Sequence, residues 1–271
     1  MRAFAVALLL AVLLCNAGFI GGAIAQSAPD AGRAVDIPTR SGVTQRFLLM
    51  EAKQPRAVVV LFAGGDGGLR LAPDGSMGGL RSNFLVRTRQ LFADRGLSVA
   101  VIDAPSDRQQ SPYLSGWRQS PEHTQDVRLV MAWLRQNLKL PVWLIGTSRG
   151  TQSVAAIATR LADSPDNADN ADGIVLTSTI LTDRNGRPVP AMPLDKLTMP
   201  VLVVHHEQDG CALCRYSGIP DLMQKLTRVT RKDLQTWRGG IDRGDPCEAM
   251  AYHGFNGLDN EVVAAIAAWI K

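Results

Sequence analysis

The chain has 271 residues, a formal net charge of +4, 46% hydrophobic residues and 20% charged residues. This composition excludes a chain that is disordered, collagen-like or coiled coil over most of its length. The basic residues are dispersed along the sequence, and only 6% of the residues are aromatic. A nucleic-acid-binding surface needs clustered Lys and Arg with aromatic platforms for the bases, so we expect no nucleic acid partner.

The first segment has the pattern of a secretory signal peptide. Arg2 supplies a positive charge, residues 3–14 form an apolar run, and Ala23-Ile24-Ala25 ends the segment with small residues at alternate positions. We therefore predict a signal peptide at residues 1–25 and export to the periplasm or out of the cell, with an uncleaved anchor as the alternative. No later stretch has the roughly 20 apolar residues of a membrane span, so we expect none after cleavage.

Beyond this segment, strand-like and helix-like patterns alternate. Short β-branched apolar runs predict buried parallel strands, and apolar residues at helical spacing predict the helices between them. The expected strands are residues 57–63, 97–103, 141–145, 174–178, 201–205 and 234–237, with an antiparallel pair within 35–50 at the sheet edge, and the expected helices are residues 84–93, 127–138, 154–161 and 261–270. The alternation predicts one α/β domain, residues 26–271, with a mostly parallel sheet covered on both faces.

One motif lies between an expected strand and an expected helix. Gly146-Thr147-Ser148-Arg149-Gly150 is a G-x-S-x-G sequence. In such a turn a side chain at either glycine would collide with the neighbouring strand or helix, and the serine Oγ is left exposed at the carboxyl end of the strand. The following helix N-terminus also directs backbone N–H groups toward a developing negative charge. The motif predicts Ser148 as a nucleophile.

With this motif the chain resembles the α/β-hydrolase family over essentially the whole of residues 26–271. The resemblance implies the α/β-hydrolase fold, with little or no lid, and a catalytic order of serine, acid and histidine. Among the four histidines, only His253 follows both the serine and a candidate acid. The other three, His123, His205 and His206, precede one or both of these positions. We therefore expect His253 to be the general base.

The acid is expected where a buried strand ends in a polar turn. Asp209 fits best an acid that orients the imidazole and stabilises its charged form. Glu207, nearer the strand end, and Asp183, after the preceding strand, are the alternatives. The adjacent His205 and His206 should point to opposite faces of a strand, so we expect no metal site there. The predicted acyl transfer needs no cofactor.

Acyl transfer also needs two N–H donors for the oxyanion. The resemblance implies Arg149, directly after the nucleophile, and Gly65 or Asp66 in the loop after the first central strand. The family commonly begins this loop with His-Gly, whereas this chain has Ala63-Gly64, so the second donor stays open between the two residues. The loop lacks the Lys-Ser/Thr of a P-loop and the third spaced glycine of a dinucleotide site, which argues against nucleotide binding.

Export would place the cysteines in an oxidising compartment. Cleavage removes Cys15 and leaves Cys211, Cys214 and Cys247, which predicts one disulfide and one free thiol. We expect the pair Cys211–Cys247, with Cys214–Cys247 as the alternative. The first pairing would tie the loop of the acid to the loop of the histidine.

The substrate is the least constrained feature. The segment 179–199 is too short for a sizeable helical lid, which favours an open site and a small or soluble ester. The side chains expected to wall the site are Tyr113, Trp117, Met192, Tyr252 and Phe255, and Arg149 would either attract an acidic substrate or face solvent. We expect an exported serine hydrolase that cleaves a carboxylic ester through an acyl-enzyme. A serine peptidase or amidase with the same triad and a non-catalytic binding protein on the same scaffold are the alternatives, and the oligomeric state is open.

Overall fold

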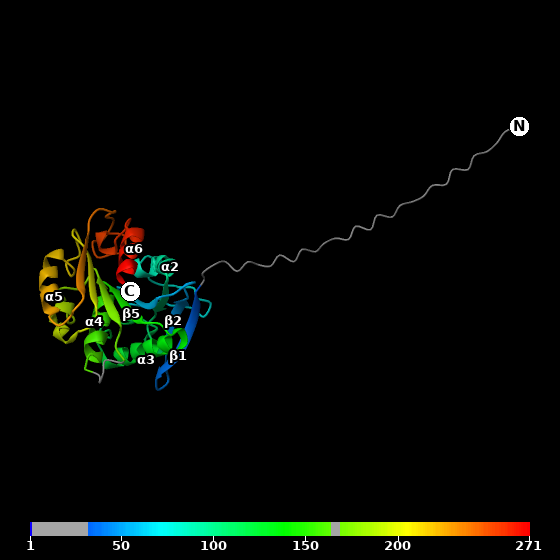
Figure 1. Cartoon of the computed structure of the whole chain (residues 1–271), viewed down its shortest axis with the longest axis horizontal. Helices are drawn as coiled ribbons and strands as arrows, with labels where there is room; N and C mark the ends of the chain where they lie inside the picture. The colour runs from blue at the N-terminus through cyan, green and yellow to red at the C-terminus, as the bar shows by residue number, and fades with distance from the viewer. Residues whose placement is uncertain (2–31, 164–168) are drawn as a thin grey trace.

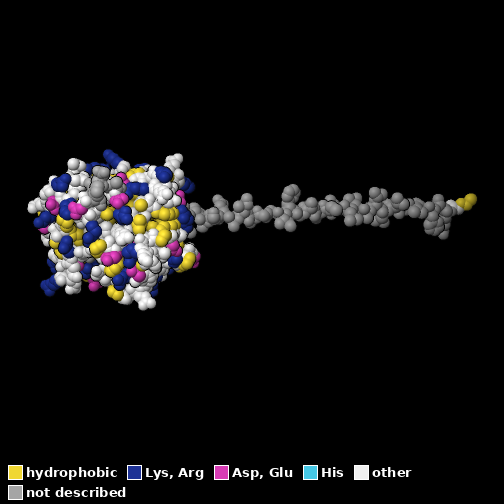
Figure 2. Space-filling view, turned by 90° about the horizontal axis from the view of Figure 1, so that it is seen from below, with side chains coloured by type: hydrophobic (Ala, Val, Ile, Leu, Met, Phe, Trp, Pro, Cys, Tyr) yellow, Lys and Arg dark blue, Asp and Glu magenta, His cyan; other side chains and the backbone are white. Residues whose placement is uncertain are grey.

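The structure is a computed structural model that describes residues 1, 32–163 and 169–271. The predicted signal peptide and its cleavage site therefore lie outside the described residues, apart from Met1. No helix of the described chain combines the length and the apolar composition needed to cross a membrane. On the face shown in Figure 2, Lys and Arg side chains are dispersed among Asp and Glu. This arrangement matches the scatter of basic residues along the sequence.

The described strands form one sheet in the order β1-β2-β4-β3-β5-β6-β7-β8. Their bounds are β1 Arg33–Arg40, β2 Val43–Met50, β3 Ala57–Phe62, β4 Leu97–Ile102, β5 Val142–Thr147, β6 Gly173–Thr177, β7 Val201–His206 and β8 Lys232–Trp237. Strands β1 and β2 pair antiparallel, as do β2 and β4, and every pair from β4 to β8 is parallel. The predicted antiparallel edge and the parallel centre are both confirmed.

Helices cover both faces of this sheet (Figure 1). Helices α1 (Phe84–Arg87), α2 (Arg89–Ala93) and α6 (Asp259–Trp269) pack on one face, and α3 (Pro121–Leu138), α4 (Gly150–Leu161) and α5 (Ile219–Lys225) pack on the other. Strand β5 shows why both faces are apolar. Val142 and Leu144 join the core beneath α3 and α4, whereas Trp143 and Ile145 join the core beneath α2 and α6. Alternate side chains of a strand point to opposite faces, so a doubly covered strand is apolar throughout.

Several helix boundaries differ from the sequence prediction. Helix α3 begins at Pro121 rather than at residue 127, because the Ser120 side chain caps it by accepting a hydrogen bond from the His123 N–H at 3.0 Å. The single helix expected at residues 84–93 is interrupted at Thr88, whose hydroxyl donates to the Phe84 carbonyl at 2.6 Å. Helix α5 was not predicted, because its seven residues are too few for a clear apolar period.

The segment 179–199 forms no lid. Among its residues the structure shows only two short 3-10 turns, Val189–Ala191 and Leu194–Lys196, whose buried residues Val189 and Leu194 belong to the core beneath α4. This confirms the expectation of little or no lid. The carboxyl edge of the parallel strands is therefore not covered by a helical cap from this segment.

We predict that Gly150→Ala destabilises the fold by about 3 kcal/mol through steric overlap in a packed interior. A Cβ at Gly150 would lie 2.1 Å from the Phe62 carbonyl oxygen, and this backbone atom has little freedom to move. Chemical denaturation of both proteins measures the difference. Gly78→Ala is the matched control, because its nearest neighbour, the Arg70 Cβ, lies 3.4 Å away. Equal stability of the two variants would contradict the steric account.

Candidate active site

Ser148 occupies a strained turn between β5 and α4. Its φ of +52° is in the left-handed region, which is unfavourable for a residue with a side chain. The turn is held because the Ser148 N–H donates to the Thr177 carbonyl at 3.0 Å. A Cβ at Gly146 would lie 2.5 Å from the Gly150 carbonyl oxygen. The two glycines are thus required by contacts between strand and helix, as the motif predicts.

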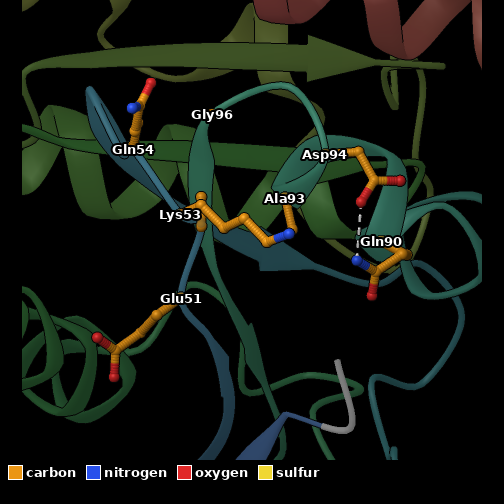
Figure 3. Close-up of a pocket in the computed structure, with 8 residues that line it drawn as sticks. Glu51, Lys53, Gln54, Gln90, Ala93, Asp94 and Gly96 are labelled. Atoms are coloured by element: carbon orange, nitrogen blue, oxygen red, sulfur yellow. Dashed lines mark hydrogen bonds between the residues drawn. The ribbon is translucent and has the colours of Figure 1, made fainter. Parts of the chain in front are cut away.

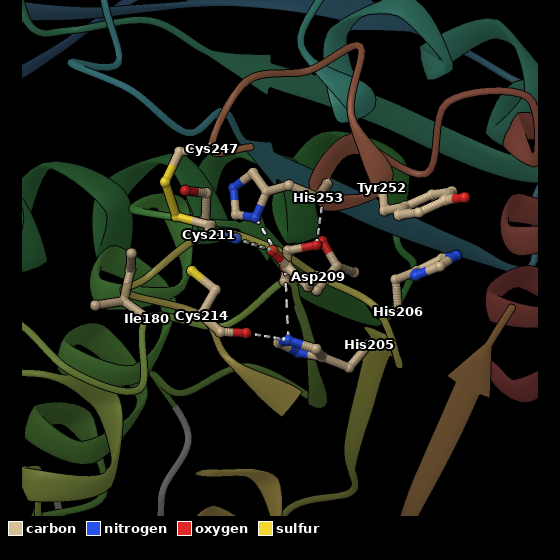
Figure 4. Close-up of polar contacts among 12 residues, drawn as sticks. Ile180, His205, His206, Asp209, Cys211, Cys214, Cys247, Tyr252 and His253 are labelled. Carbon is tan, nitrogen blue, oxygen red and sulfur yellow. Dashed lines mark hydrogen bonds and ion pairs between the residues drawn. A yellow bond between two sulfur atoms is a disulfide. The ribbon is translucent and has the colours of Figure 1, made fainter. Parts of the chain in front are cut away.

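Asp209 and His253 form a buried pair (Figure 4). The Nδ1 atom of His253 lies 2.8 Å from Oδ2 of Asp209, and the side chains are 4% and 0% exposed. The second carboxylate oxygen accepts a hydrogen bond from the Cys211 N–H at 2.9 Å. Asp209 follows β7, and His253 lies in the 3-10 turn Tyr252–Gly254 before α6. The carboxylate therefore holds the imidazole through Nδ1, and the imidazole Nε2 atom points away from Asp209.

The Nε2 atom of His253 is buried and has no hydrogen-bond partner among the described residues. His253 and Ser148 line the same cavity of about 120 Å³. The other lining residues are Gly64, Gly65, Leu80, Ser82, Asn83, Phe84, Thr147, Cys247, Glu248, Ala249 and Gly254. A serine and an unpaired imidazole nitrogen thus face a shared space, which is the arrangement that a general base needs near its nucleophile.

The two alternative acids are engaged elsewhere. Glu207 forms an ion pair with Arg238. Asp183 accepts from Arg149 and from Gln152, each at 2.9 Å. Burial works to raise the pKa of Asp183, but hydrogen bonds from the Asn185 N–H, Gln152 and Arg149 outweigh it and lower that pKa. Neither carboxylate has a recorded contact with the imidazole. Arg149, expected either to attract an acidic substrate or to face solvent, pairs with Asp183 through Nη1 while its side chain stays 33% exposed.

The two histidines of β7 point to different surroundings, as expected from their adjacency. His205 Nε2 lies 2.6 Å from the Cys214 carbonyl oxygen and 3.6 Å from Asp209 Oδ2. Burial lowers the pKa of His205, so the neutral ring donates to that carbonyl and packs beneath the acid. His206 instead stacks on Tyr252, with ring centroids 4.4 Å apart. The separation leaves no shared position for a metal ion.

A disulfide joins Cys211 to Cys247 (Figure 4), which is the preferred pairing of the sequence analysis. It connects the segment after Asp209 to the segment before His253. Among the described residues Cys214 is the free cysteine, and its burial raises the pKa of its thiol. Donor atoms of Cys211, Cys214 and His253 lie within 4.8 Å of one another. This cluster is not a free set of metal ligands, because the Cys211 sulfur is oxidised.

The loop that contains the predicted second oxyanion donor lies next to Ser148. Gly64 lies directly beside it, since a Cβ there would be 3.0 Å from the Ser148 Cβ. Gly65 lines the cavity, whereas Asp66 is not among the residues that line it. The backbone N–H groups of Gly65, Asp66 and Arg149 have no recorded partner among the described residues. Free N–H groups beside a serine Oγ are what an oxyanion hole requires.

The predicted wall of the site is wrong. None of the five expected side chains lines the cavity, namely Tyr113, Trp117, Met192, Tyr252 and Phe255. Met192 and Phe255 are core residues, and the Phe255 ring packs against Phe84 at a centroid distance of 5.0 Å. Trp117 lies under the Arg108 guanidinium at 4.0 Å. Large apolar side chains close to a catalytic motif are buried in the hydrophobic core, so they do not line the small cavity.

The residues that do wall the cavity come from two segments without a strong sequence pattern. Leu80, Ser82 and Asn83 precede α1, and Glu248 and Ala249 follow the disulfide cysteine. The second group had a usable signal, since a Cys211–Cys247 bridge must bring residues next to Cys247 close to the acid. For the first group the sequence offered no comparable constraint.

A larger cavity of about 570 Å³ lies between the end of β2 and α2 (Figure 3). Its polar residues include Glu51, Lys53 and Asp94, and Asp94 accepts from Gln90 at 2.9 Å. No serine, cysteine or histidine lines it. It offers no nucleophile with a base, so the small cavity at Ser148 is the candidate for chemistry.

The fold is shared with known hydrolases. An alpha-beta serine hydrolase homologue from Coxiella burnetii superimposes with a TM-score of 0.59 at 13% identity, covering 88% of this chain and 97% of that one. A cold-adapted esterase from an Arctic intertidal metagenomic library gives 0.58 at 15% identity, covering 89% and 93%. Dienelactone hydrolase from Anabaena variabilis gives 0.55 at 15% identity, covering 89% and 97%. The chain therefore has the α/β-hydrolase fold. No protein-family model and no curated protein matches it by sequence.

We predict that loss of the Cys211–Cys247 bridge lowers the free energy of unfolding by about 4 kcal/mol, because a cross-link over this span restricts the unfolded chain. Denaturation with and without reducing agent measures the difference. The unreduced protein that begins at residue 26 should expose one thiol to a thiol reagent, and only after unfolding, because Cys214 is buried. Three reactive thiols in the unreduced, unfolded protein would contradict the pairing.

Proposed function

We propose that the protein is an exported serine hydrolase that cleaves a carboxylic ester of a small or soluble substrate through an acyl-enzyme. The observation that carries the proposal is the buried pair of Asp209 and His253, whose free Nε2 atom shares a cavity with Ser148. The similarity to esterase structures supports the same class. Predicted export is supported by the signal-like segment and by the disulfide.

In the proposed reaction, Ser148 Oγ attacks the ester carbonyl while His253 Nε2 takes the hydroxyl proton. The carbonyl electrons move to the oxygen, and the N–H groups of Arg149 and of Gly65 stabilise the resulting oxyanion. Collapse of this intermediate breaks the bond to the leaving alcohol, which receives the proton from His253. Water then attacks the acyl-enzyme by the same route and releases the acid.

Asp209 has an electrostatic and an orienting role in this scheme. Its Oδ2 atom accepts the Nδ1–H of His253, which leaves Nε2 unprotonated and able to accept the serine proton. When His253 becomes positively charged, the carboxylate stabilises that charge. The hydrogen bond from the Cys211 N–H keeps the carboxylate in place, so the disulfide segment supports the geometry of the acid.

The size of the cavity favours a short acyl group. Its volume of about 120 Å³ is below the roughly 300–1,000 Å³ of pockets that enclose drug-sized ligands. The walls combine the backbone of three glycines and the side chains of Leu80 and Phe84 with the polar residues Ser82, Asn83 and Glu248. Such a site suits a small apolar acyl group with a leaving alcohol that extends into solvent, and a panel of short-chain esters against aminoacyl amides separates an esterase from an amidase.

We predict that Ser148→Ala reduces hydrolysis of a short-chain p-nitrophenyl ester by about 10⁵-fold or more, because the covalent route is lost. Steady-state kinetics and circular dichroism of the same preparation measure activity and fold. Persistence of the wild-type rate in the folded variant would sink the assignment of the nucleophile. Absence of activity in the wild type toward both esters and amides would favour a binding protein.

Asp209→Asn should lower kcat by roughly 10⁴-fold, because the amide stabilises the wrong imidazole tautomer and cannot balance the imidazolium charge. Glu207→Gln is the matched control, since Glu207 lies two residues away and pairs with Arg238 at the surface. We expect the control to retain kcat within about twofold. A larger loss in the Glu207 variant than in the Asp209 variant would reassign the acid.

A further inference from the structure

Arg118 is a buried cation without an acidic partner. Its residue is 4% exposed, and no carboxylate of the described chain forms an ion pair with it. Burial first, and the nearby Arg149 second, lower the pKa of Arg118 to about 9, against an opposing effect of the Asp66 carboxylate. A buried charge of this kind reduces stability unless polar groups replace its hydration. The polar groups that replace the hydration of Arg118 belong to the loop beside Ser148.

One nitrogen of Arg118 binds three consecutive carbonyl groups. Nη2 donates to the carbonyls of Ala63 at 2.9 Å, Gly64 at 3.2 Å and Gly65 at 3.1 Å. The next carbonyl, that of Asp66, accepts from the Leu114 N–H at 2.8 Å. The segment before α3 thus holds the carbonyls of residues 63–66, the first part of the loop that follows β3.

The hydrogen bonds from Arg118 Nη2 fix the direction of the N–H groups of Gly65 and Asp66. In a trans peptide the C=O and the N–H of one unit point in opposite directions. The carbonyls of Gly64 and Gly65 belong to the peptide units whose N–H groups are those of Gly65 and Asp66. Because Arg118 binds these carbonyls, both N–H groups point away from the guanidinium. They are the two candidates for the second oxyanion donor, and neither has a recorded partner among the described residues.

The guanidinium itself is anchored from the other side. Its Nη1 donates to Ser153 Oγ at 3.1 Å, and that oxygen also lies 3.1 Å from His123 Nε2. Burial, with a further contribution from Arg118, lowers the pKa of His123 to about 3. The ring is therefore neutral, and its Nε2 atom shares a hydrogen bond with the Ser153 hydroxyl. Ser153 is on α4, which begins directly after the nucleophile turn, so one network ties that helix to the loop after β3.

We propose that Arg118 is a positioning residue of the oxyanion hole, an inference that rests on the proposed function. It aligns the Gly65 and Asp66 peptide units and polarises their N–H groups through the bound carbonyls. It makes no contact with substrate and changes no bond. Its positive charge also favours the negative oxygen of the tetrahedral intermediate, because burial leaves that field weakly screened.

The first test separates this role from packing. Loss of one oxyanion-hole donor costs about 10²–10³ in kcat, so Arg118→Met, which keeps the donors but removes their alignment and the nearby charge, should lose roughly 10- to 100-fold in kcat. KM should stay within about threefold, since the hole acts mainly in the transition state. Arg118→Lys keeps the positive charge, so its kcat should lie between those of the wild type and of Arg118→Met. Arg128→Met is the control, because Arg128 pairs with Asp169 at the surface and should keep wild-type kcat.

The second test supplies free guanidinium to Arg118→Ala, which lacks this group. A cavity of about 370 Å³ is lined by Arg118 together with Ser115, Gly116, Gln119 and Arg149, so a small cation has a route to the position. Millimolar guanidinium should raise kcat of Arg118→Ala about tenfold or more at constant ionic strength. Urea has the same shape without the charge and should restore much less. A variant damaged only in its fold would not respond to guanidinium in this way.

The outcomes distinguish this inference from the proposed function. The rate of inactivation by a small fluorophosphonate is measured for the wild type and for all three Arg118 variants, with melting curves. A wild type that does not react overturns the proposed function. A reactive wild type with folded Arg118 variants of equal kcat and equal inactivation rate overturns only the role of Arg118. A loss in kcat that guanidinium does not reverse also overturns it.

Discussion

The close approach of β5, α4 and β3 at Ser148 is the constraint on which the rest of the site depends. The chain reverses there through a left-handed residue, and the flanking glycines leave 2.5 Å and 2.1 Å between a would-be Cβ and backbone oxygens. Any larger residue would separate the helix from the sheet. The strain at Ser148 is maintained because the buried sheet surrounds it, and its result is a serine that lines the cavity at the carboxyl edge.

Parallel strands then bring the remaining groups to that edge. The loop after β3 supplies free N–H groups, the turn after β7 supplies Asp209, and the segment after β8 supplies His253. Each of these loops is held from outside the site, the first by Arg118 and the other two by the Cys211–Cys247 bridge. The sheet sets the positions approximately, and these polar and covalent contacts set the orientation needed for chemistry.

Strong local sequence patterns predicted most of the fold and the catalytic candidates. The β-branched runs determine the strands, and the serine, acid and histidine order implied by the resemblance singles out His253 among the four histidines. The start of α3 was misplaced because Ser120-Pro121 is a capping signal that overrides the apolar period. The wall of the site was mispredicted because packing decides which aromatic residues stay accessible, and Phe255 is needed against Phe84. The role of Arg118 depends on contacts with three distant carbonyls, which a single sequence does not reveal.

Mass spectrometry of the protein after brief exposure to a fluorophosphonate tests the central claim most directly. Such reagents bond covalently to a serine whose hydroxyl is activated by a neighbouring base. The account predicts one adduct per chain, located on the peptide that contains Ser148 and absent after Ser148→Ala. An adduct on a different residue, or an unlabelled protein that still hydrolyses esters, would contradict it.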